Sequence, residues 1–273
     1  MSTTGFVASD GAAYELFMGR WTECLAEPFL TFAGIGSEIA AGGHPLDVGC
    51  GTGRLTFAAA RRAPQLAKLV GVDLSESFLT YAKARSTDER ISFESGDACR
   101  LTYPDGIFDR VISSLALDLI PEPERAASEM CRVTKPGGIV AATVWHLRGG
   151  VGAIMMCFDI AAALDPAAAM SRHDACASSL ERPGGLSALW RAVGLGAVEE
   201  VPITIQMGCA DFADYWASFT GGQGRLGSYV AGLSEERRAR LQDEVCKAYC
   251  AGDKDGSRSF SATAWAVRGV VPG

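Results

Sequence analysis

The sequence has little that would suit a metalloprotein, a membrane protein or a nucleic-acid-binding protein. It contains only three histidines, and its nine cysteines are scattered without a CxxC pair or a zinc-like spacing. The longest apolar segment, 151–164, is interrupted by Asp159 and is shorter than the roughly 20 residues that a membrane span needs. The net charge of −7 disfavours a polyphosphate or an anionic membrane as partner. We therefore expect no metal, no membrane span and no nucleic-acid partner.

Signals for export are also absent. The first residues, MSTTGFVASDGAAY, have neither the basic start nor the apolar core of a signal peptide. The unpaired cysteine pattern is typical of reduced thiols, so the sequence predicts a cytoplasmic protein. The basic residues Arg237, Arg238 and Arg240 follow two glutamates on a predicted helix, which indicates a solvated face.

What is present is the pattern of an α/β protein. From Pro45 to about Trp145, short apolar runs alternate with longer amphipathic stretches, which is typical of βαβ units and a parallel sheet. A helical stripe from Leu186 to Val193 follows later in the chain. We expect strands at 46–50, 68–73, 91–95, 108–113, 139–144, 198–205 and 259–267, with helices between the first five.

Two segments interrupt this order, 147–182 and 207–256. The second is predicted to be an inserted helical element, because a structureless loop of that length is uncommon inside a domain. The chain is therefore expected to form a single domain, 1–273. Its predicted parts are an N-terminal helical lid (1–44), a cofactor-binding core (45–146) and two helical excursions, 147–182 and 207–256, that form a substrate lid.

The stretch LDVGCGTGRLT carries three alternating glycines, Gly49, Gly51 and Gly53, directly after a predicted strand. Neither register completes the dinucleotide fingerprint GxGxxG, because the sixth position is Arg54 or Thr56. A P-loop is also excluded, since no lysine lies near. The loop permits a ligand to approach the backbone closely but lacks the parts that bind phosphate.

Two acids follow the next two predicted strands. Asp73 lies about 20 residues after the last glycine, where a carboxylate can accept hydrogen bonds from ribose hydroxyls. Asp97 ends the third strand, where it can accept from the exocyclic amine of adenine beside the backbone N–H of Ala98. Either acid alone could instead cap a turn or a helix. Their coincidence with the glycine loop on one sheet edge favours a nucleoside ligand.

These motifs carry a family resemblance. The stretches LDVGCGTGRLT, GVDLS, SGDACRLTYPDGIFDRVISSLALDLIPEPERAASEMCRVTKPGGIVAATVW and LSALWRAVGL resemble a class I S-adenosylmethionine-dependent methyltransferase of the type 11 (UbiE-like) family. The resemblance implies a Rossmann-like three-layer α/β sandwich with a seven-stranded, mostly parallel sheet in the order 3-2-1-4-5-7-6, strand 7 being antiparallel. It implies S-adenosyl-L-methionine as cofactor, which has no phosphate and so explains the incomplete phosphate loop.

The resemblance also implies a set of cofactor-binding residues. It places Asp47, Gly49, Cys50 and Gly51 beside the methionine moiety, Asp73 at the ribose, Leu74 on the adenine, Asp97 and Ala98 at the adenine edge, and Ser113, Ser114 and Leu115 beside the transferring methyl group. Arg20, with Tyr14 beside it, is expected to bind the cofactor carboxylate, although an exposed arginine is the alternative.

The acceptor is predicted to be a small, partly apolar molecule. The segment SSLALDLI after the fourth strand lacks the motifs of enzymes that methylate nucleic-acid bases, and only Asp118 is available there for a metal. An apolar stripe that includes Phe17 and Trp21, together with the two excursions, is expected to exclude water.

One histidine is a candidate general base. His146 ends the fifth strand facing the expected acceptor, and packing or capping is the alternative reading. Gln223 and Tyr229 are weaker candidates for contact with the acceptor. A non-catalytic binder of S-adenosylmethionine or S-adenosylhomocysteine and, less favoured, an NAD(P)-dependent oxidoreductase remain as alternative functions. A monomer or a homodimer is expected.

Overall fold

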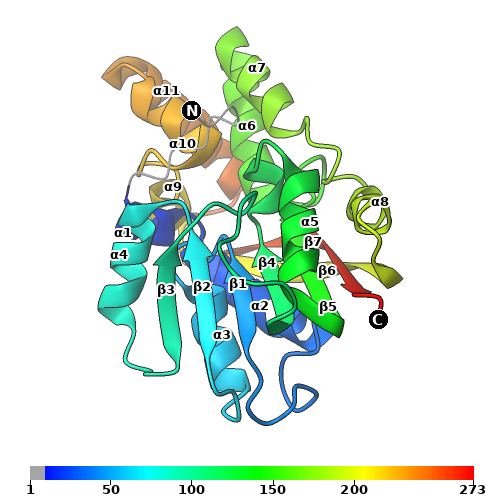
Figure 1. Cartoon of the computed structure of the whole chain (residues 1–273). Coiled ribbons are helices and arrows are strands. Elements are labelled where there is room, and N and C mark those ends of the chain that lie inside the picture. Colours follow the sequence, from blue (N-terminus) through cyan, green and yellow to red (C-terminus); the bar gives the residue numbers. More distant parts are fainter. Residues whose placement is uncertain (1–9) are drawn as a thin grey trace.

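The structure, a computed structural model, describes residues 10–273 and is built around a seven-stranded sheet with the order β3-β2-β1-β4-β5-β7-β6 (Figure 1). The strands are β1 (Pro45–Val48), β2 (Leu69–Asp73), β3 (Ile91–Ser95), β4 (Phe108–Ser114), β5 (Thr134–Trp145), β6 (Gly196–Cys209) and β7 (Arg258–Val270). Strands β1 to β5 pair in parallel, and β7 pairs antiparallel with β5 and β6. This confirms the fold and the strand order that the sequence predicts.

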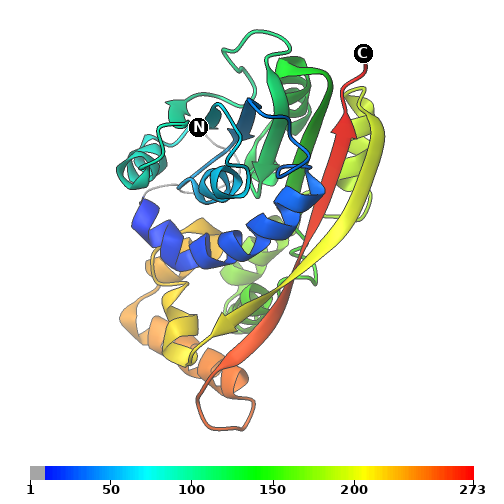
Figure 2. The same ribbon diagram turned by 90° about the horizontal axis from the view of Figure 1, so that it is seen from below.

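Helices cover both faces of the sheet, and each face has its own apolar core (Figure 2). The helices α2 (Arg20–Phe32) and α3 (Arg54–Arg62) pack on one face, and α5 (Pro123–Val133) and α8 (Gly185–Ala192) on the other. In α5 the buried residues Ala126, Met130 and Val133 recur at helical spacing, so one stripe faces the sheet. Helix α4 (Glu76–Arg85) lies against β2 and β3. The chain enters α2 through α1 (Gly11–Tyr14) and the π-helical turn η1 (Glu15–Gly19).

The two excursions gather into one group of helices, here called the helical cap. It consists of α6 (Gly152–Leu164), α7 (Pro166–Ala175), α9 (Phe212–Ala217), α10 (Gly224–Gly232) and α11 (Glu235–Cys250) (Figure 1). The long strands β6 and β7 run from the sheet out to this cap (Figure 2). Several expected strand bounds need correction. The sixth strand continues to Cys209, so the helical part of the second excursion begins at Phe212. The fifth strand already begins at Thr134, and the seventh continues to Val270. The first strand ends at Val48 because Gly49 turns the chain with a φ of +72°.

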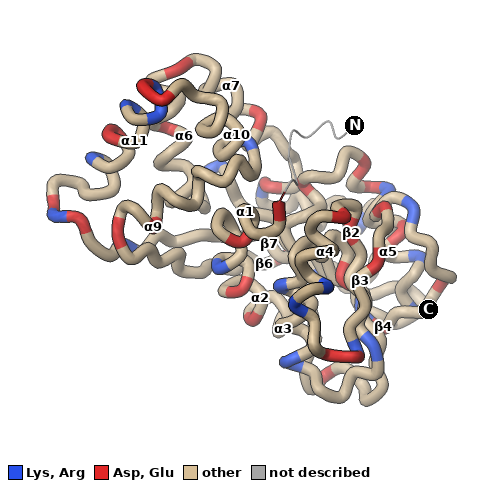
Figure 3. Tube along the Cα trace, turned by 90° about the vertical axis from the view of Figure 1, so that its left-hand side faces the viewer, with Lys and Arg blue, Asp and Glu red and all other residues tan. Residues whose placement is uncertain are grey.

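The outer surface of the cap carries charges of both signs. Positive and negative residues alternate along α11 (Figure 3). Arg237, Arg238 and Arg240 are exposed, and Arg237 pairs with Asp165 at 2.7 Å. The prediction of a solvated basic face on this helix is confirmed.

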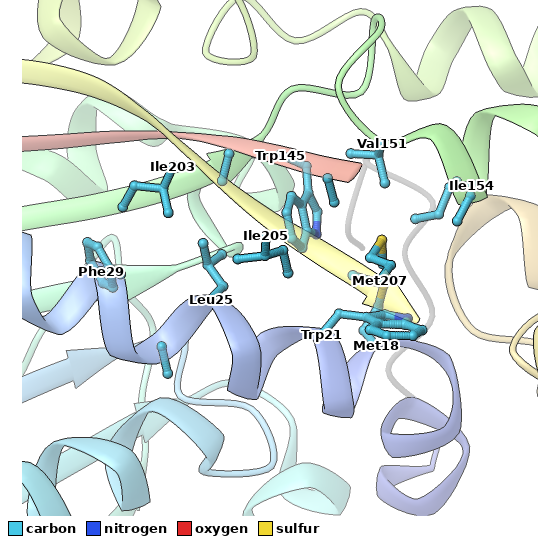
Figure 4. Close-up of a cluster of buried hydrophobic side chains, with 14 of the residues drawn as sticks. Met18, Trp21, Leu25, Phe29, Trp145, Val151, Ile154, Ile203, Ile205 and Met207 are labelled. Atoms are coloured by element: carbon cyan, nitrogen blue, oxygen red, sulfur yellow. The ribbon is translucent and has the colours of Figure 1, made fainter. Parts of the chain in front are cut away.

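The cap and the sheet share one apolar core. Figure 4 shows Trp21 and Met18 facing Met207 of β6, with Trp145 of β5 and Ile154 of α6 close by. These residues belong to one cluster of buried side chains that runs from α2 to the cap. The cap is therefore fixed by burial of apolar surface as well as by the two long strands.

A buried tyrosine joins two helices of the cap. Tyr215 of α9 is 1% exposed, and its hydroxyl donates a hydrogen bond of 2.6 Å to the backbone oxygen of Ala153 in α6. We predict that Tyr215→Phe lowers the free energy of unfolding by about 1–3 kcal/mol, because the buried carbonyl loses its donor. Urea denaturation measures the change, and Tyr81→Phe, at a half-buried tyrosine, serves as control for the loss of a phenol. Equal stability of wild type and Tyr215→Phe would contradict this role.

Candidate functional site

The glycine loop between β1 and α3 approaches its neighbours so closely that a side chain is excluded. The backbone N–H of Gly49 donates to the backbone oxygen of Val72 at 2.8 Å. A Cβ atom on Gly49 would lie 2.5 Å from the Cβ of Ala116, and its φ of +72° is a left-handed value that glycine adopts readily. Gly51, with a φ of +54°, lies in the same loop. The loop therefore presents bare backbone to the space above it.

Asp73 links this loop to the end of β2. One carboxylate oxygen accepts a hydrogen bond from the backbone N–H of Gly51 at 2.8 Å, and the other accepts from that of Ser75 at 2.8 Å. Burial raises the pKa of Asp73, and the hydrogen bonds from these two backbone groups oppose that effect. The side chain remains half-buried, so each oxygen keeps a lone pair for a ligand.

A cavity of about 510 Å³ lies above the loop and is here called the cofactor cavity. Nine of the residues predicted to bind the cofactor line this cavity. They are Tyr14, Gly49, Gly51, Asp73, Leu74, Asp97, Ala98, Ser114 and Leu115. Leu74 is 70% exposed, which is unusual for a leucine and suits a flat apolar ring. One oxygen of Asp97 accepts from the backbone N–H of Cys99 at 2.8 Å. The sheet edge thus brings together most of the residues that the sequence singles out.

Three predicted cofactor residues, Asp47, Cys50 and Ser113, are buried and do not line the cavity. Asp47 is 1% exposed and accepts a hydrogen bond of 2.6 Å from the hydroxyl of Thr56; burial raises its pKa to about 7. The side chain of Cys50 is buried in a small cluster with Leu79 and Phe93, and Ser113 is fully buried. Their part in binding the cofactor stays a prediction.

Arg20 does not line the cavity. Its guanidinium donates two hydrogen bonds, of 2.8 and 2.9 Å, to the carboxylate of Asp214 and lies 4.1 Å from the ring centre of Trp21. This ion pair ties α2 to α9 in the cap. The expected contact of Arg20 with the cofactor carboxylate stays a prediction, and it would compete with this ion pair to Asp214.

A second cavity, of about 490 Å³, adjoins the first and is here called the acceptor cavity. Its walls are mainly apolar and come from η1, the ends of β4 and β5, and the cap; they include Phe17, Met18, Trp145, Leu147, Ile154, Phe158 and Leu226. Tyr14, Leu115, Leu119, Ile120 and Pro121 line both cavities. The two spaces therefore meet at the end of β4, and the residues at this junction are here called the shared wall.

The shared wall contains a strained residue. Leu115 has a φ of +59°, a value that costs a branched side chain of this kind about 1–3 kcal/mol. Its backbone N–H donates to Thr143 at 2.8 Å, and the hydroxyl groups of Ser114 and Thr143 lie 3.1 Å apart. These contacts with β5 hold Leu115 in place between the cavities.

His146, the predicted base, does not line the acceptor cavity. Its neighbours Trp145 and Leu147 do, and the alternation along the strand end turns the imidazole to the other side, where it meets the ring of Trp265. Its Nδ1 lies 3.1 Å from the backbone oxygen of Glu181. The geometry favours the packing alternative over a role as base.

We therefore predict that His146→Asn keeps methyl transfer within about threefold of the wild type. A base in direct contact with the acceptor would instead contribute roughly 100-fold or more. The rate constant measured across pH 6–9 tests this, and a fall of 100-fold at constant thermal stability would restore His146 as base.

Two acids to which the sequence assigns no catalytic role line the acceptor cavity. Asp118 lies in η2 (Leu117–Leu119), and Glu181, 2% exposed, lies in the loop between α7 and α8. Burial raises the pKa of Asp118 to about 6 and that of Glu181 to about 8. Asp118 could have been noticed because it follows β4, but no local pattern marks Glu181.

Within residues 10–273, no group of three histidine, cysteine or acidic side chains is arranged to hold a metal ion. Over the same residues, no helix is both long and apolar enough to cross a bilayer.

The strand order, the antiparallel β7, the glycine loop after β1 and the acids after β2 and β3 define the fold of class I S-adenosylmethionine-dependent methyltransferases. Phosphoethanolamine N-methyltransferase 2 from Haemonchus contortus in complex with S-adenosyl-L-methionine shares it, with a TM-score of 0.61 and 20% identity over 100% of this chain and 59% of that chain. The YcgJ protein from Bacillus subtilis matches with a TM-score of 0.55 and 18% identity, covering 91% and 98%. At these identities the likeness concerns the fold.

Sequence comparison finds relatives for the central part of the chain. Residues 46–142 match the family described as "Methyltransferase domain". Demethylmenaquinone methyltransferase from Symbiobacterium thermophilum is 39% identical over 106 residues (37% of this chain, 42% of that protein), and the one from Shouchella clausii 36% over 104 residues (37% and 44%). The chain thus spans less than half the length of these relatives. Over segment 46–142 the chain is similar to methyltransferases of type 11, which agrees with the resemblance.

Proposed function

We propose that the protein transfers the methyl group of S-adenosyl-L-methionine to a small, largely apolar acceptor. The observation that carries this proposal is the shared wall between the two cavities at Leu115 and Tyr14. A nucleoside site on one side and an apolar space on the other is the arrangement that a direct methyl transfer requires.

The residues of the cofactor cavity fit this cofactor. Bare backbone at Gly49 and Gly51 suits its amino-acid part, Asp73 offers carboxylate oxygens to the ribose, and Leu74 with Ala98 suits the adenine. When bound, the cofactor supplies an electrophilic methyl group on a sulfonium. The chain's contribution is to orient the acceptor and to exclude water, which in well-oriented systems lowers the barrier by up to about 7–11 kcal/mol.

The names of the relatives do not identify the methyl acceptor of this protein. Their names describe methylation of demethylmenaquinone, but the matched segment is 46–142. Most of the acceptor cavity, including Phe17, Met18, Ile154, Phe158 and Leu226, lies outside it. We infer that the helical cap and η1 choose the acceptor and act as its lid.

Two alternatives are less well supported. A purely binding protein needs no second space, yet an acceptor cavity of about 490 Å³ adjoins the cofactor cavity. An NAD(P)-dependent oxidoreductase would bind a diphosphate on a GxGxxG loop, and this loop has Arg54 where the third glycine would stand.

The remaining parts of the proposal concern the type of partner, the location in the cell, the oligomeric state and the domain organisation. The acidic chain and the mixed charges of the cap (Figure 3) support a small-molecule acceptor over nucleic acid or a membrane surface. We place the protein in the cytoplasm, acting as a monomer or homodimer without a metal. We further assign residues 1–44 and the two excursions to one domain with the core.

Calorimetric titration tests the proposed function. We expect S-adenosylmethionine and S-adenosylhomocysteine to bind and NAD⁺ and NADP⁺ not to bind. Incubation with methyl-labelled S-adenosylmethionine and a panel of small apolar amines, phenols and quinols should then yield a labelled product. Binding of NADP⁺ without binding of S-adenosylmethionine would overturn the proposal.

A further inference from the structure

The acceptor cavity contains acidic oxygens that have no hydrogen-bond donor. Oδ1 of Asp118 and Oε2 of Glu181 are buried, and neither has a partner among the residues that the structure describes. Both side chains line the cavity, and Glu181 is 2% exposed. A buried carboxyl oxygen without a donor is destabilising, so these two atoms are suited to a donor that arrives with a bound molecule.

The charges around the cavity add a second constraint. Its lining contains three acids, Asp118, Asp174 and Glu181, and one base, Arg225. Arg225 lies 3.9 Å from Asp174, so this pair compensates itself and the other two acids remain. Arg148 stabilises the ionised form of Glu181 from outside the lining. The lining is therefore mainly apolar with two acids that no lining base compensates, which suits an apolar cation and repels an anion.

We propose that Asp118 and Glu181 bind the ammonium group of an apolar primary or secondary amine and accept the proton that its nitrogen must lose before methylation. This inference rests on the proposed methyltransferase function and names its substrate class. An ammonium group brings N–H donors and a positive charge to both orphaned oxygens. A neutral alcohol or phenol brings one donor and no charge, and so leaves one of the two buried oxygens without a donor.

The proton states of the two acids agree with this role. Burial raises both pKa values, that of Asp118 to about 6 and that of Glu181 to about 8, and the charge of Asp118 adds to the effect on Glu181. At neutral pH the empty pair therefore holds about one proton. Binding of an ammonium favours the ionised form of Glu181, so that this proton is released to solvent.

The two carboxyl groups, the amine and the cofactor account for every proton and electron pair in the reaction. The bound ammonium gives one proton to a carboxylate and becomes a neutral amine with a lone pair. This lone pair forms the new N–C bond to the methyl carbon as the C–S bond breaks, and the electron pair of that bond stays on sulfur. The products are a methylated ammonium and neutral S-adenosylhomocysteine, and the carboxyl returns its proton to solvent.

Titration of the protein loaded with S-adenosylhomocysteine tests the proposal. The probes are tryptamine and 2-phenylethylamine, each compared with its uncharged alcohol, tryptophol or 2-phenylethanol, at pH 7. We expect the amines to bind at least tenfold more tightly than the alcohols. Asp118→Asn and Glu181→Gln should each weaken amine binding at least tenfold and leave alcohol binding within twofold. The control Asp159→Asn, which removes an exposed acid outside the cavity, should bind the amines as the wild type does.

A second readout separates direct binding from a structural role. Calorimetry in buffers of different ionisation enthalpy should show release of about one proton per amine bound by the wild type, and close to none by Glu181→Gln. Amines that bind no better than alcohols, or amine binding that both variants leave unchanged, would overturn the assignment. Retained binding of S-adenosylhomocysteine shows that a variant is folded. Failure of S-adenosylhomocysteine to bind the wild type would instead overturn the proposed function.

Discussion

Asp73→Ala is expected to weaken the binding of S-adenosylmethionine and S-adenosylhomocysteine by at least about 100-fold. Two hydrogen bonds from ribose hydroxyls to a carboxylate are lost, and each is worth roughly 1.5–3 kcal/mol. The backbone N–H groups of Gly51 and Ser75 lose their acceptor as well, so the glycine loop becomes less ordered. Isothermal titration of both ligands measures the effect.

Two further variants test whether the loss of affinity comes from the Asp73 carboxylate itself. Asp73→Asn keeps the size of the side chain and one oxygen, so we expect a loss intermediate between wild type and alanine. Glu89→Ala removes an exposed acid at the opposite end of the sheet, before β3, and should leave both affinities unchanged. If Asp73→Ala bound the two ligands as tightly as the control does, the carboxylate would not be the ribose contact.

Glu181→Gln is expected to make the protein less sensitive to alkaline pH. Burial, with the nearby charge of Asp118, raises the pKa of Glu181 from 4.5 to about 8, while Arg148 and the backbone of Leu147 oppose the rise. The unfolded chain ionises this group above about pH 4.5, but the folded chain holds it protonated up to about pH 8. Its contribution to stability is therefore complete below pH 4.5 and is lost as the pH rises to about 8.

The size of this effect is on the order of 2 kcal/mol. Urea denaturation at pH 5 and pH 8.5 should show a smaller fall in the free energy of unfolding for Glu181→Gln than for wild type. Asp159→Asn, exposed on α6, is the matched control and should fall as the wild type does. An identical pH dependence of wild type and Glu181→Gln would mean that Glu181 is ionised in the folded protein at neutral pH.

Much of the fold could be predicted because it is encoded locally. The alternation of apolar runs and amphipathic stretches gives the parallel strands, and the KPGG stretch marks the end of α5 at Val133. The extension of β6 to Cys209 was missed although Ile203, Ile205 and Met207 are buried at alternate positions, which is a strand pattern. Gly208 obscures the end of this pattern, and the pairing with β7 that carries the strand to Cys209 joins residues about 50 positions apart.

In the candidate site, too, features encoded by short motifs could be predicted, and features that depend on distant parts of the chain could not. The glycine loop and Asp73 were predicted because their chemistry needs backbone conformations and strand ends that short motifs encode. The partner of Arg20 could not be predicted, since Asp214 lies 194 residues away in the chain. Glu181 was missed for a similar reason, because a loop between two helices brings it to the cavity.

The most direct test of the account is a crystal structure of the protein with S-adenosylhomocysteine. We predict that both ribose hydroxyls lie within hydrogen-bond distance of the Asp73 carboxylate, with the adenine on Leu74 and the sulfur beside Leu115, facing the acceptor cavity. A nucleoside bound elsewhere, or a sulfur atom directed away from that cavity, would contradict the account.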